Sequence, residues 1–139
     1  MRTAIFSASF DQLEAIREFV NRATGDAGMN ESGRCALEMA VDEACSNIIE
    51  HAYKGLSLGE IECICDYDTQ TFKVILRDHG HPFDINSVPL PDLTDPLEKR
   101  KVGGLGVYLI RELMDDVMYE NKGELGNILT LMRKISREK

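Results

Sequence analysis

The chain has 139 residues, of which 43% are hydrophobic and 29% charged, and its formal net charge at pH 7 is −8. This composition is ordinary for a globular protein, and the length predicts one domain with one core. The acidic charge argues against direct nucleic-acid binding, because it repels phosphate backbones at long range. No apolar run is long enough to cross a membrane, and the N-terminus lacks the pattern of a secretory signal. We therefore expect a cytoplasmic protein without a membrane partner.

The four cysteines, Cys35, Cys45, Cys63 and Cys65, are not arranged as metal ligands. They form no CxxC pair, and no histidine lies at a zinc-ligand spacing from them. Cys63 and Cys65 would share one face of a strand with small apolar residues. We expect reduced, structural thiols.

The first predicted elements are a strand at Arg2–Ser7 and a helix that follows it. Ser9 and Gln12 have the spacing of a capping box at the helix start. Apolar residues then recur at helical spacing up to Gly25, which we expect to stop the helix. One face of this helix should therefore be buried in the core.

The second predicted helix is capped by Asn30 and ends near Gly55. It carries small and apolar residues on more than one face, so we expect it to be sandwiched. Glu43 and Asn47 are one turn apart on one face, and His51 is a further turn along. A carboxylate can orient or deprotonate a nucleophile, and an amide oxygen suits Mg²⁺. Alone, however, such a pair is more typical of a solvated helix face.

Two antiparallel hairpins are predicted in the second half of the chain. Ile61–Tyr67 and Thr71–Asp78 both alternate between apolar and polar residues, and they are joined by a short turn. A second hairpin is expected between Val117 and Ile135, with its turn around Gly123–Asn127.

A long irregular segment, His79–Lys101, separates the hairpins and contains all four prolines. Connections of this length are usually lids or disordered insertions, and we favour a lid. The segment runs into the glycine-rich stretch Gly103–Gly106, after which a third amphipathic helix is predicted from Val107 to Val117.

Several of these stretches could contact a nucleotide. Asp78 ends a strand, where its carboxylate could accept a hydrogen bond from an exocyclic amine, and Gly80 would let a base approach the backbone. The same pattern is also typical of a plain turn. Gly103–Gly106 opens a helix, as phosphate sites often do, although a flexible hinge explains it equally well. Thr130 is the candidate buried hydroxyl of the last strand, where it would bond to the backbone or to a base.

The order of these motifs is more specific than any one of them. A helix with ExxxN, a strand ending in DxGxPF, a long segment ending in GGLG, a helix and then GNxLTL follow one another from Asp11 to Leu131. This arrangement resembles the N, G1, G2 and G3 boxes of the ATPase superfamily that includes gyrase, the histidine kinases and the mismatch-repair ATPases. Within that superfamily, the short form with EACSN resembles the anti-sigma-factor serine kinases of the RsbW type.

The resemblance implies a role for each motif residue. Glu43 would be the catalytic base for a serine hydroxyl, Asn47 would hold Mg²⁺, and Asp78 would bind the adenine amine of ATP or ADP. The other residues implied to contact the nucleotide are Gly80, Gly104, Leu105, Gly106 and Thr130. In the family, an arginine before the lid glycines often reaches the terminal phosphate. Here Val102 occupies that place, which leaves Lys99, Arg100 or Lys101 as substitutes.

The resemblance also implies a fold and partners. The fold is a two-layer α/β sandwich with a mixed, largely antiparallel sheet that helices cover on one face. Residues 1–139 would form a single histidine-kinase-like ATPase domain with a nucleotide lid at about 79–106. The implied substrate is a STAS-domain anti-anti-sigma factor, a sigma factor is a possible second partner, and a homodimer is expected. Its surface could involve the first strand and helix.

Two other functions remain open from the sequence. In the first, the chain is a nucleotide-dependent binding switch without kinase turnover, in which ATP only orders the lid. In the second, it is a fragment of a sensor histidine kinase. That reading is disfavoured, because no phosphoaccepting helical hairpin precedes the first strand and His51 lies inside the ExxxN helix.

Overall fold

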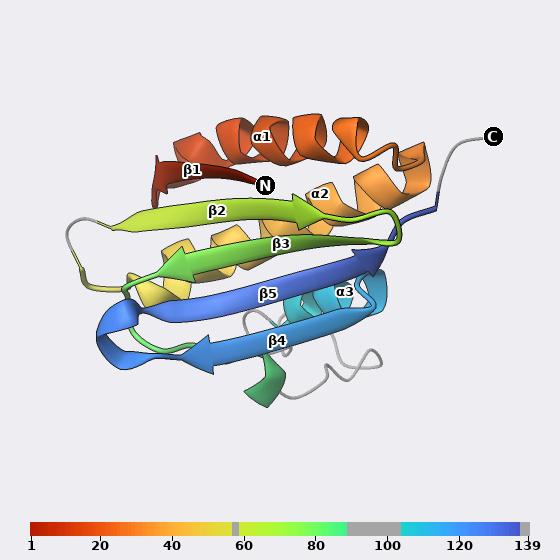
Figure 1. Cartoon of the computed structure of the whole chain (residues 1–139). Coiled ribbons are helices and arrows are strands. Elements are labelled where there is room, and N and C mark those ends of the chain that lie inside the picture. The colour runs from red at the N-terminus through yellow and green to blue at the C-terminus, as the bar shows by residue number, and fades with distance from the viewer. Residues whose placement is uncertain (57–58, 89–103, 137–139) are drawn as a thin grey trace.

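The computed structural model describes residues 1–56, 59–88 and 104–136, which form two layers (Figure 1). One layer is a five-stranded sheet of order β1-β2-β3-β5-β4, and the other consists of helices behind it. The strands are β1 (Arg2–Ser7), β2 (Glu60–Tyr67), β3 (Thr71–Asp78), β4 (Asp116–Asn121) and β5 (Asn127–Lys134). The helices are α1 (Leu13–Asp26), α2 (Glu31–Asn47) and α3 (Gly104–Leu113). The predicted sandwich, with helices on one face of the sheet, is confirmed.

The sheet is antiparallel at every pairing between the described strands. Both predicted hairpins are present, as β2–β3 and β4–β5. Because side chains alternate along a strand, one face of each strand enters the core. Val74 and Leu76 of β3 and Leu131 of β5 are fully buried on the face that the helices cover. We predicted a mixed, largely antiparallel sheet, and no parallel pair occurs among these five strands.

The start of α1 differs from the prediction. The Ser9 hydroxyl donates a hydrogen bond to Asp11 and makes no capping bond to the helix, so the capping box with Gln12 does not form. A 3₁₀ turn at Phe10–Gln12 precedes α1 instead. Nor does Gly25 stop the helix, which ends at Asp26; the chain turns at Gly28, whose φ is 77°. At that φ, glycine is favoured because it has no Cβ.

Helix α2 is the centre of the helical layer. The Asn30 side chain accepts a hydrogen bond from the Gly33 amide at 2.8 Å, which confirms the predicted cap. The helix packs against α1, α3 and the sheet, as its apolar faces predicted (Figure 1). After Asn47 the coil widens into a π-helix at Ile48–Ala52, and the Tyr53 amide donates to the Ile48 carbonyl at 3.1 Å. Such widened turns are rare and often occur at functional sites.

The four cysteines are free thiols, as predicted. Cys45, Cys63 and Cys65 are fully buried, whereas Cys35 is exposed. Burial raises the pKa of the Cys45 thiol to about 12. A thiol with so high a pKa stays protonated at neutral pH and is a poor nucleophile.

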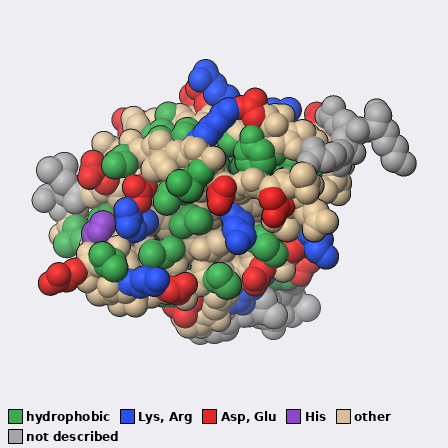
Figure 2. Space-filling view, in the orientation of Figure 1, with side chains coloured by type: hydrophobic (Ala, Val, Ile, Leu, Met, Phe, Trp, Pro, Cys, Tyr) green, Lys and Arg blue, Asp and Glu red, His purple; other side chains and the backbone are tan. Residues whose placement is uncertain are grey.

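The other face of the sheet is not covered by the described helices. Figure 2 shows this face, on which hydrophobic side chains are interspersed with charged ones. Ile5 and Met118 are among its exposed apolar residues, at 59% and 48%. In the described ranges, no helix combines the length and the apolar character that crossing a membrane requires.

Candidate functional site

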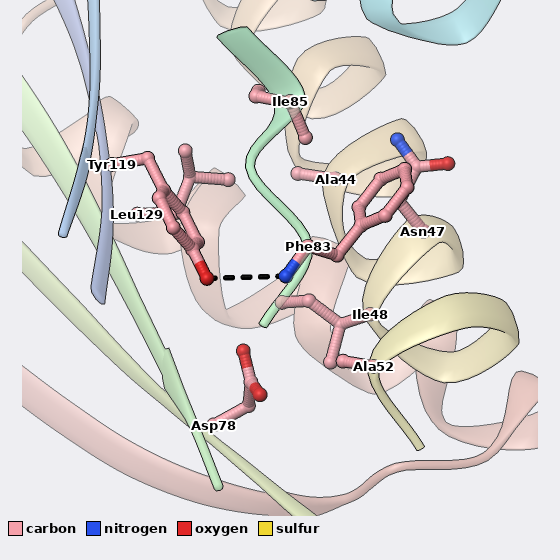
Figure 3. A pocket seen from close by; sticks show the side chains of 9 residues that line it. All are labelled: Ala44, Asn47, Ile48, Ala52, Asp78, Phe83, Ile85, Tyr119 and Leu129. Carbon is pink, nitrogen blue, oxygen red and sulfur yellow. Dashed lines mark hydrogen bonds between the residues drawn. The ribbon is translucent and has the colours of Figure 1, made fainter. Parts of the chain in front are cut away.

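A small cavity lies between α2 and the end of β3 where Asp78 stands (Figure 3). Its volume is about 20 Å³, which is room for about one water molecule. It is mostly apolar, and it is lined by Ala44, Asn47, Ile48, Ala52, Asp78, Phe83, Ile85, Tyr119 and Leu129. The structure therefore brings the predicted residues Asn47 and Asp78, 31 positions apart in sequence numbering, to one pocket.

Asp78 is the acidic group of this pocket, and only 5% of it is exposed. Its Oδ1 accepts hydrogen bonds from the Asn127 side-chain amide and the Gly80 backbone amide, each at 2.9 Å. No described residue donates to its second oxygen. Burial raises the pKa of Asp78, and the two donors partly oppose this shift. The site thus presents a buried carboxylate with one oxygen available to a hydrogen-bond donor.

Gly80 lies against the end of the π-helix. A Cβ at this position would be 2.3 Å from the backbone oxygen of Ala52, which cannot move aside like a side chain. The next residue reinforces the contact, because the His81 amide donates to the same Ala52 oxygen at 2.5 Å. Gly80 is therefore needed for the close packing that holds β3 and the π-helix together beside the cavity.

The segment after β3 forms one wall of the cavity. The Phe83 ring stacks on His51 of the π-helix, with centroids 4.5 Å apart and an angle of 17° between the rings. The Phe83 amide donates to the Tyr119 hydroxyl at 3.1 Å. Arg111 of α3 donates to the Ile85 carbonyl at 2.7 Å. This segment is therefore tied to the π-helix, β4 and α3 at once.

Glu43 and Asn47 lie one turn apart on α2, as predicted. A Cβ on Gly106 would be 2.4 Å from Glu43 Oε2, so the first turn of α3 packs directly against this carboxylate. Burial raises the pKa of Glu43, and the nearby carboxylates of Asp42 and Glu50 raise it further. Glu43 therefore lies inside α2 and beside the start of α3. A carboxylate with a raised pKa is suited to accept a proton at that place.

The residues present fit a magnesium ion that is held mainly by a nucleotide. Asn47 is 5% exposed, and no described residue donates to its side-chain oxygen; its amide nitrogen, a donor that cannot ligate a metal, is buried without a described partner. In residues 1–56, 59–88 and 104–136 no group of three acidic, histidine or cysteine side chains could hold a metal. Mg²⁺ is commonly bound through one or two protein oxygens, with phosphates and water as its other ligands. Asn47 can supply one such oxygen.

The predicted site residues Gly104, Leu105 and Gly106 open α3. Leu105 is 39% exposed, and Gly106 faces Glu43. Most of the predicted lid, together with Lys99, Arg100 and Lys101, lies outside the described residues.

Thr130 does not belong to this site, contrary to the prediction. It pairs with Ile75 and Met118 across the sheet, whereas its neighbours Leu129 and Leu131 are buried on the helix side. Because strand side chains alternate between faces, Thr130 points away from the cavity.

Asn127 is the polar residue of β5 at the site, and it was missed from the sequence. It is 3% exposed and lies opposite Asp78 in the β3–β5 ladder. The alternation of β5 could have identified it, because Asn127 shares its strand face with Leu129 and Leu131. Tyr119 was missed as well. It pairs with Leu129 across β4 and β5, which places it on the same face of the sheet as that cavity residue.

The chain is similar in sequence to proteins of a known family. The family of the histidine kinase-like ATPase domain matches residues 6–133. The serine-protein kinase RsbW of Bacillus thuringiensis (strain Al Hakam) is 33% identical over 106 residues, which are 73% of this chain and 64% of the relative. The protein of the same name from Bacillus cereus (strain B4264) is 34% identical over the same shares. The chain thus spans less than two thirds of these curated relatives.

Two solved structures have a similar fold. The RsbU and RsbW domains of a Mycobacterium tuberculosis protein match with a TM-score of 0.65 and 15% identity, over 99% of this chain and 34% of that one. The histidine kinase domain of a blue-light activated kinase from Erythrobacter litoralis matches with a TM-score of 0.52 and 16% identity, over 91% and 60%. At these identities the likeness concerns the fold alone.

The fold, the residues of the pocket and the sequence match all indicate the same family. The match covers nearly the whole chain, including the ExxxN helix and the strand that ends at Asp78. The resemblance inferred from the order of the motifs is confirmed, and the chain belongs to the histidine kinase-like ATPase domain family.

Proposed function

We propose that the chain is a protein serine kinase that binds Mg-ATP beside Asp78, between α2 and β3, where the cavity must widen beyond its present volume of about 20 Å³ to admit the base. The observation that carries this proposal is the buried Asp78 carboxylate, which has one oxygen available at a mostly apolar pocket. An apolar pocket with one fixed acceptor suits a flat base with an exocyclic amine, as adenine has. Asp78 would then bind adenine, and Gly80, packed on Ala52, would hold the end of β3 beside the base.

The reacting end of the nucleotide would lie toward Glu43 and α3. The amides of Gly104, Leu105 and Gly106 at the helix start would contact phosphate oxygens. A magnesium ion held at Asn47 would neutralise charge on the phosphates. Glu43 would accept the proton of the serine hydroxyl while the serine oxygen bonds to the γ-phosphorus. The bond from that phosphorus to the ADP oxygen breaks, and ADP leaves.

The name of the curated relatives, serine-protein kinase, supports a protein serine as the phosphate acceptor. We propose a STAS-domain anti-anti-sigma factor as the phosphate acceptor, whose affinity for the kinase changes when its serine is phosphorylated. A sigma factor would be the second partner and the kinase would act as a homodimer in the cytoplasm. These finer roles rest on the similarity to serine-protein kinase RsbW, of which the chain matches 64%.

The test is phosphoryl transfer from labelled Mg-ATP to a purified STAS-domain protein, comparing the wild-type chain with Glu43→Gln. Removing a general base slows a reaction about 10²- to 10⁴-fold, so the variant should transfer phosphate that much more slowly while still binding ADP. Glu38→Gln, on another face of α2, is the matched control and should keep the wild-type rate. An unchanged rate in Glu43→Gln would remove the catalytic role from Glu43.

The alternative function is a nucleotide-dependent binding switch without turnover. The same assay separates it from the kinase: a stable complex that depends on ATP, with no phosphoserine on the STAS partner, would favour the switch. The position of Glu43 against the start of α3 favours the kinase, because a pure switch needs no base there.

A further inference from the structure

The Tyr119 hydroxyl links the two polar walls of the cavity. On one side it accepts a hydrogen bond from the Phe83 amide at 3.1 Å. On the other side it donates to Asn127 Oδ1 at 3.0 Å. Figure 3 shows Tyr119 reaching from the sheet toward the Phe83 backbone, above the Asp78 carboxylate. One phenol group therefore joins the segment after β3 to the residue that contacts Asp78.

The Asn127 amide is held in place by four neighbours, one of which is Tyr119. Its Oδ1 accepts from Tyr119 and also from Asn121 Nδ2 at 2.7 Å. Its Nδ2 donates to Asp78 Oδ1 at 2.9 Å and to the Gly80 carbonyl at 3.1 Å. A flipped amide would place its oxygen against the Asp78 and Gly80 acceptors and its nitrogen against the Asn121 donor, so these three neighbours fix the orientation. The Tyr119 hydroxyl then donates to the amide oxygen and helps to hold it in place.

The contacts of Asn127 and Gly80 determine how the Asp78 carboxylate is turned toward a ligand. With its Oδ1 occupied by Asn127 and Gly80, the carboxylate keeps its second oxygen as an acceptor at the cavity. A base with an amine at the contacting position can donate to that oxygen. A base with a carbonyl there, such as hypoxanthine, would bring two acceptors together and leave both unpaired, which is costly in a buried site.

We propose that Tyr119 is a positioning residue that sets the preference of the pocket for adenine, by fixing Asn127 against Asp78 and by holding the Phe83 segment over the base. This inference rests on the proposed binding of a nucleotide in the cavity. Tyr119 acts through its neighbours, so its role is in selectivity and affinity and not in the transfer step.

The experiment is calorimetric titration of the full chain with ADP and with inosine diphosphate, which differ in the amine and carbonyl at one position of the base. Tyr119→Phe removes the hydroxyl and keeps the ring. The loss of about one or two net hydrogen bonds should weaken ADP binding about five- to twentyfold. The affinity for inosine diphosphate should fall less, so the ratio of the ADP affinity to the inosine diphosphate affinity should decrease. Tyr67→Phe is the matched control and should keep both affinities, because this tyrosine is 38% exposed and makes no hydroxyl hydrogen bond among the described residues.

A second readout keeps the test independent of folding effects. Hydrogen exchange of the Phe83 amide, followed by nuclear magnetic resonance, should quicken in Tyr119→Phe, since that amide loses its acceptor. If Tyr119→Phe does not fold, Asn121→Ala removes the other donor to Asn127 and should lower the same affinity ratio.

The outcomes separate this inference from the proposed function. A wild-type chain that binds neither nucleotide overturns the proposed function and this inference with it. A wild-type chain that prefers ADP, with the preference unchanged in Tyr119→Phe, overturns only the role of Tyr119. An unchanged preference in Asn121→Ala overturns the step that runs through Asn127.

Discussion

Asp78 is a buried acid whose ionisation works against the fold. Burial raises its pKa in the folded protein above the ordinary value of 3.8, although hydrogen bonds from Asn127 and Gly80 oppose the shift. The folded state therefore holds the proton more tightly than the unfolded chain does, and stability is lost as the pH rises through the folded-state pKa. Retaining such a group is understandable if a ligand supplies the missing donor.

Asp78→Asn should separate stability from binding. The new amide keeps an oxygen that can accept from Asn127 and Gly80, but it presents a donor to the cavity. The free energy of unfolding at pH 7 should be equal to or above that of the wild type, and the gap should narrow as the pH falls toward about 4. ADP affinity should fall about ten- to a hundredfold, since the hydrogen bond lost involves a charged group.

Urea denaturation at several pH values measures this difference, with the exposed Asp66→Asn as control. A variant that is less stable than the wild type at pH 7, or a gap that widens at low pH, would contradict our account of Asp78.

The sequence identified the site residues on α2 and β3 better than the site residue on β5. Asp78 and Asn47 are recognisable because each follows from a motif with fixed spacing inside one element. Thr130 was predicted because it carries a hydroxyl in an apolar strand. The sheet face on which it lies depends on which residue of β5 is the first to be buried. The buried Asn127 provides that starting point, and a shift of one position reverses every side chain of a strand.

Among the elements, the contact between α2 and α3 brings the proposed base to the proposed phosphate site. Gly106 leaves room there for the Glu43 carboxylate, which a side chain at this position would meet. The obstructing atom is the end of a flexible side chain, which can swing away. The protein can therefore tolerate a larger residue at Gly106 structurally, at the expense of the position of Glu43.

Gly106→Ala should consequently fold well and transfer phosphate poorly. Alanine is favoured over glycine in a helix by about 0.5–1 kcal/mol, so the unfolding free energy should stay the same or rise slightly. A displaced base should slow transfer by about a hundredfold. Denaturation and the labelled-ATP assay measure the two effects separately. Gly25→Ala in α1 is the control, and equal transfer rates for the two variants would refute the proposed contact.

The elements themselves were largely predictable from local patterns. Both hairpins and the buried faces of the helices follow from periodicity and turn residues, and the Asn30 cap follows from a local hydrogen bond. The capping box at Ser9 failed because the Asp11 carboxylate competes for the same hydroxyl. The π-helix at Ile48–Ala52 has no periodic signal, and it accompanies the close packing of Gly80 on Ala52.

For the whole molecule, the order of the motifs was more informative than any local pattern. It predicted the family and the two-layer fold before any contact was known. The strand order could not be read from periodicity, because β5 lies between β3 and β4 and the β3–β5 pairing joins residues about 50 positions apart. The network of Tyr119, Asn127 and Asp78 depends on that pairing, which is why two of its three members were missed.

The central claim is that α2, the end of β3 and the start of α3 enclose one purine nucleotide with its magnesium ion. Calorimetric titration of the full chain with ADP, in the presence and absence of Mg²⁺, tests this claim most directly. We predict one binding site per chain, tighter binding with magnesium, and a loss of that magnesium dependence in Asn47→Ala. The absence of binding heat with ADP and Mg²⁺, or binding that is indifferent to both magnesium and Asn47, would contradict the account.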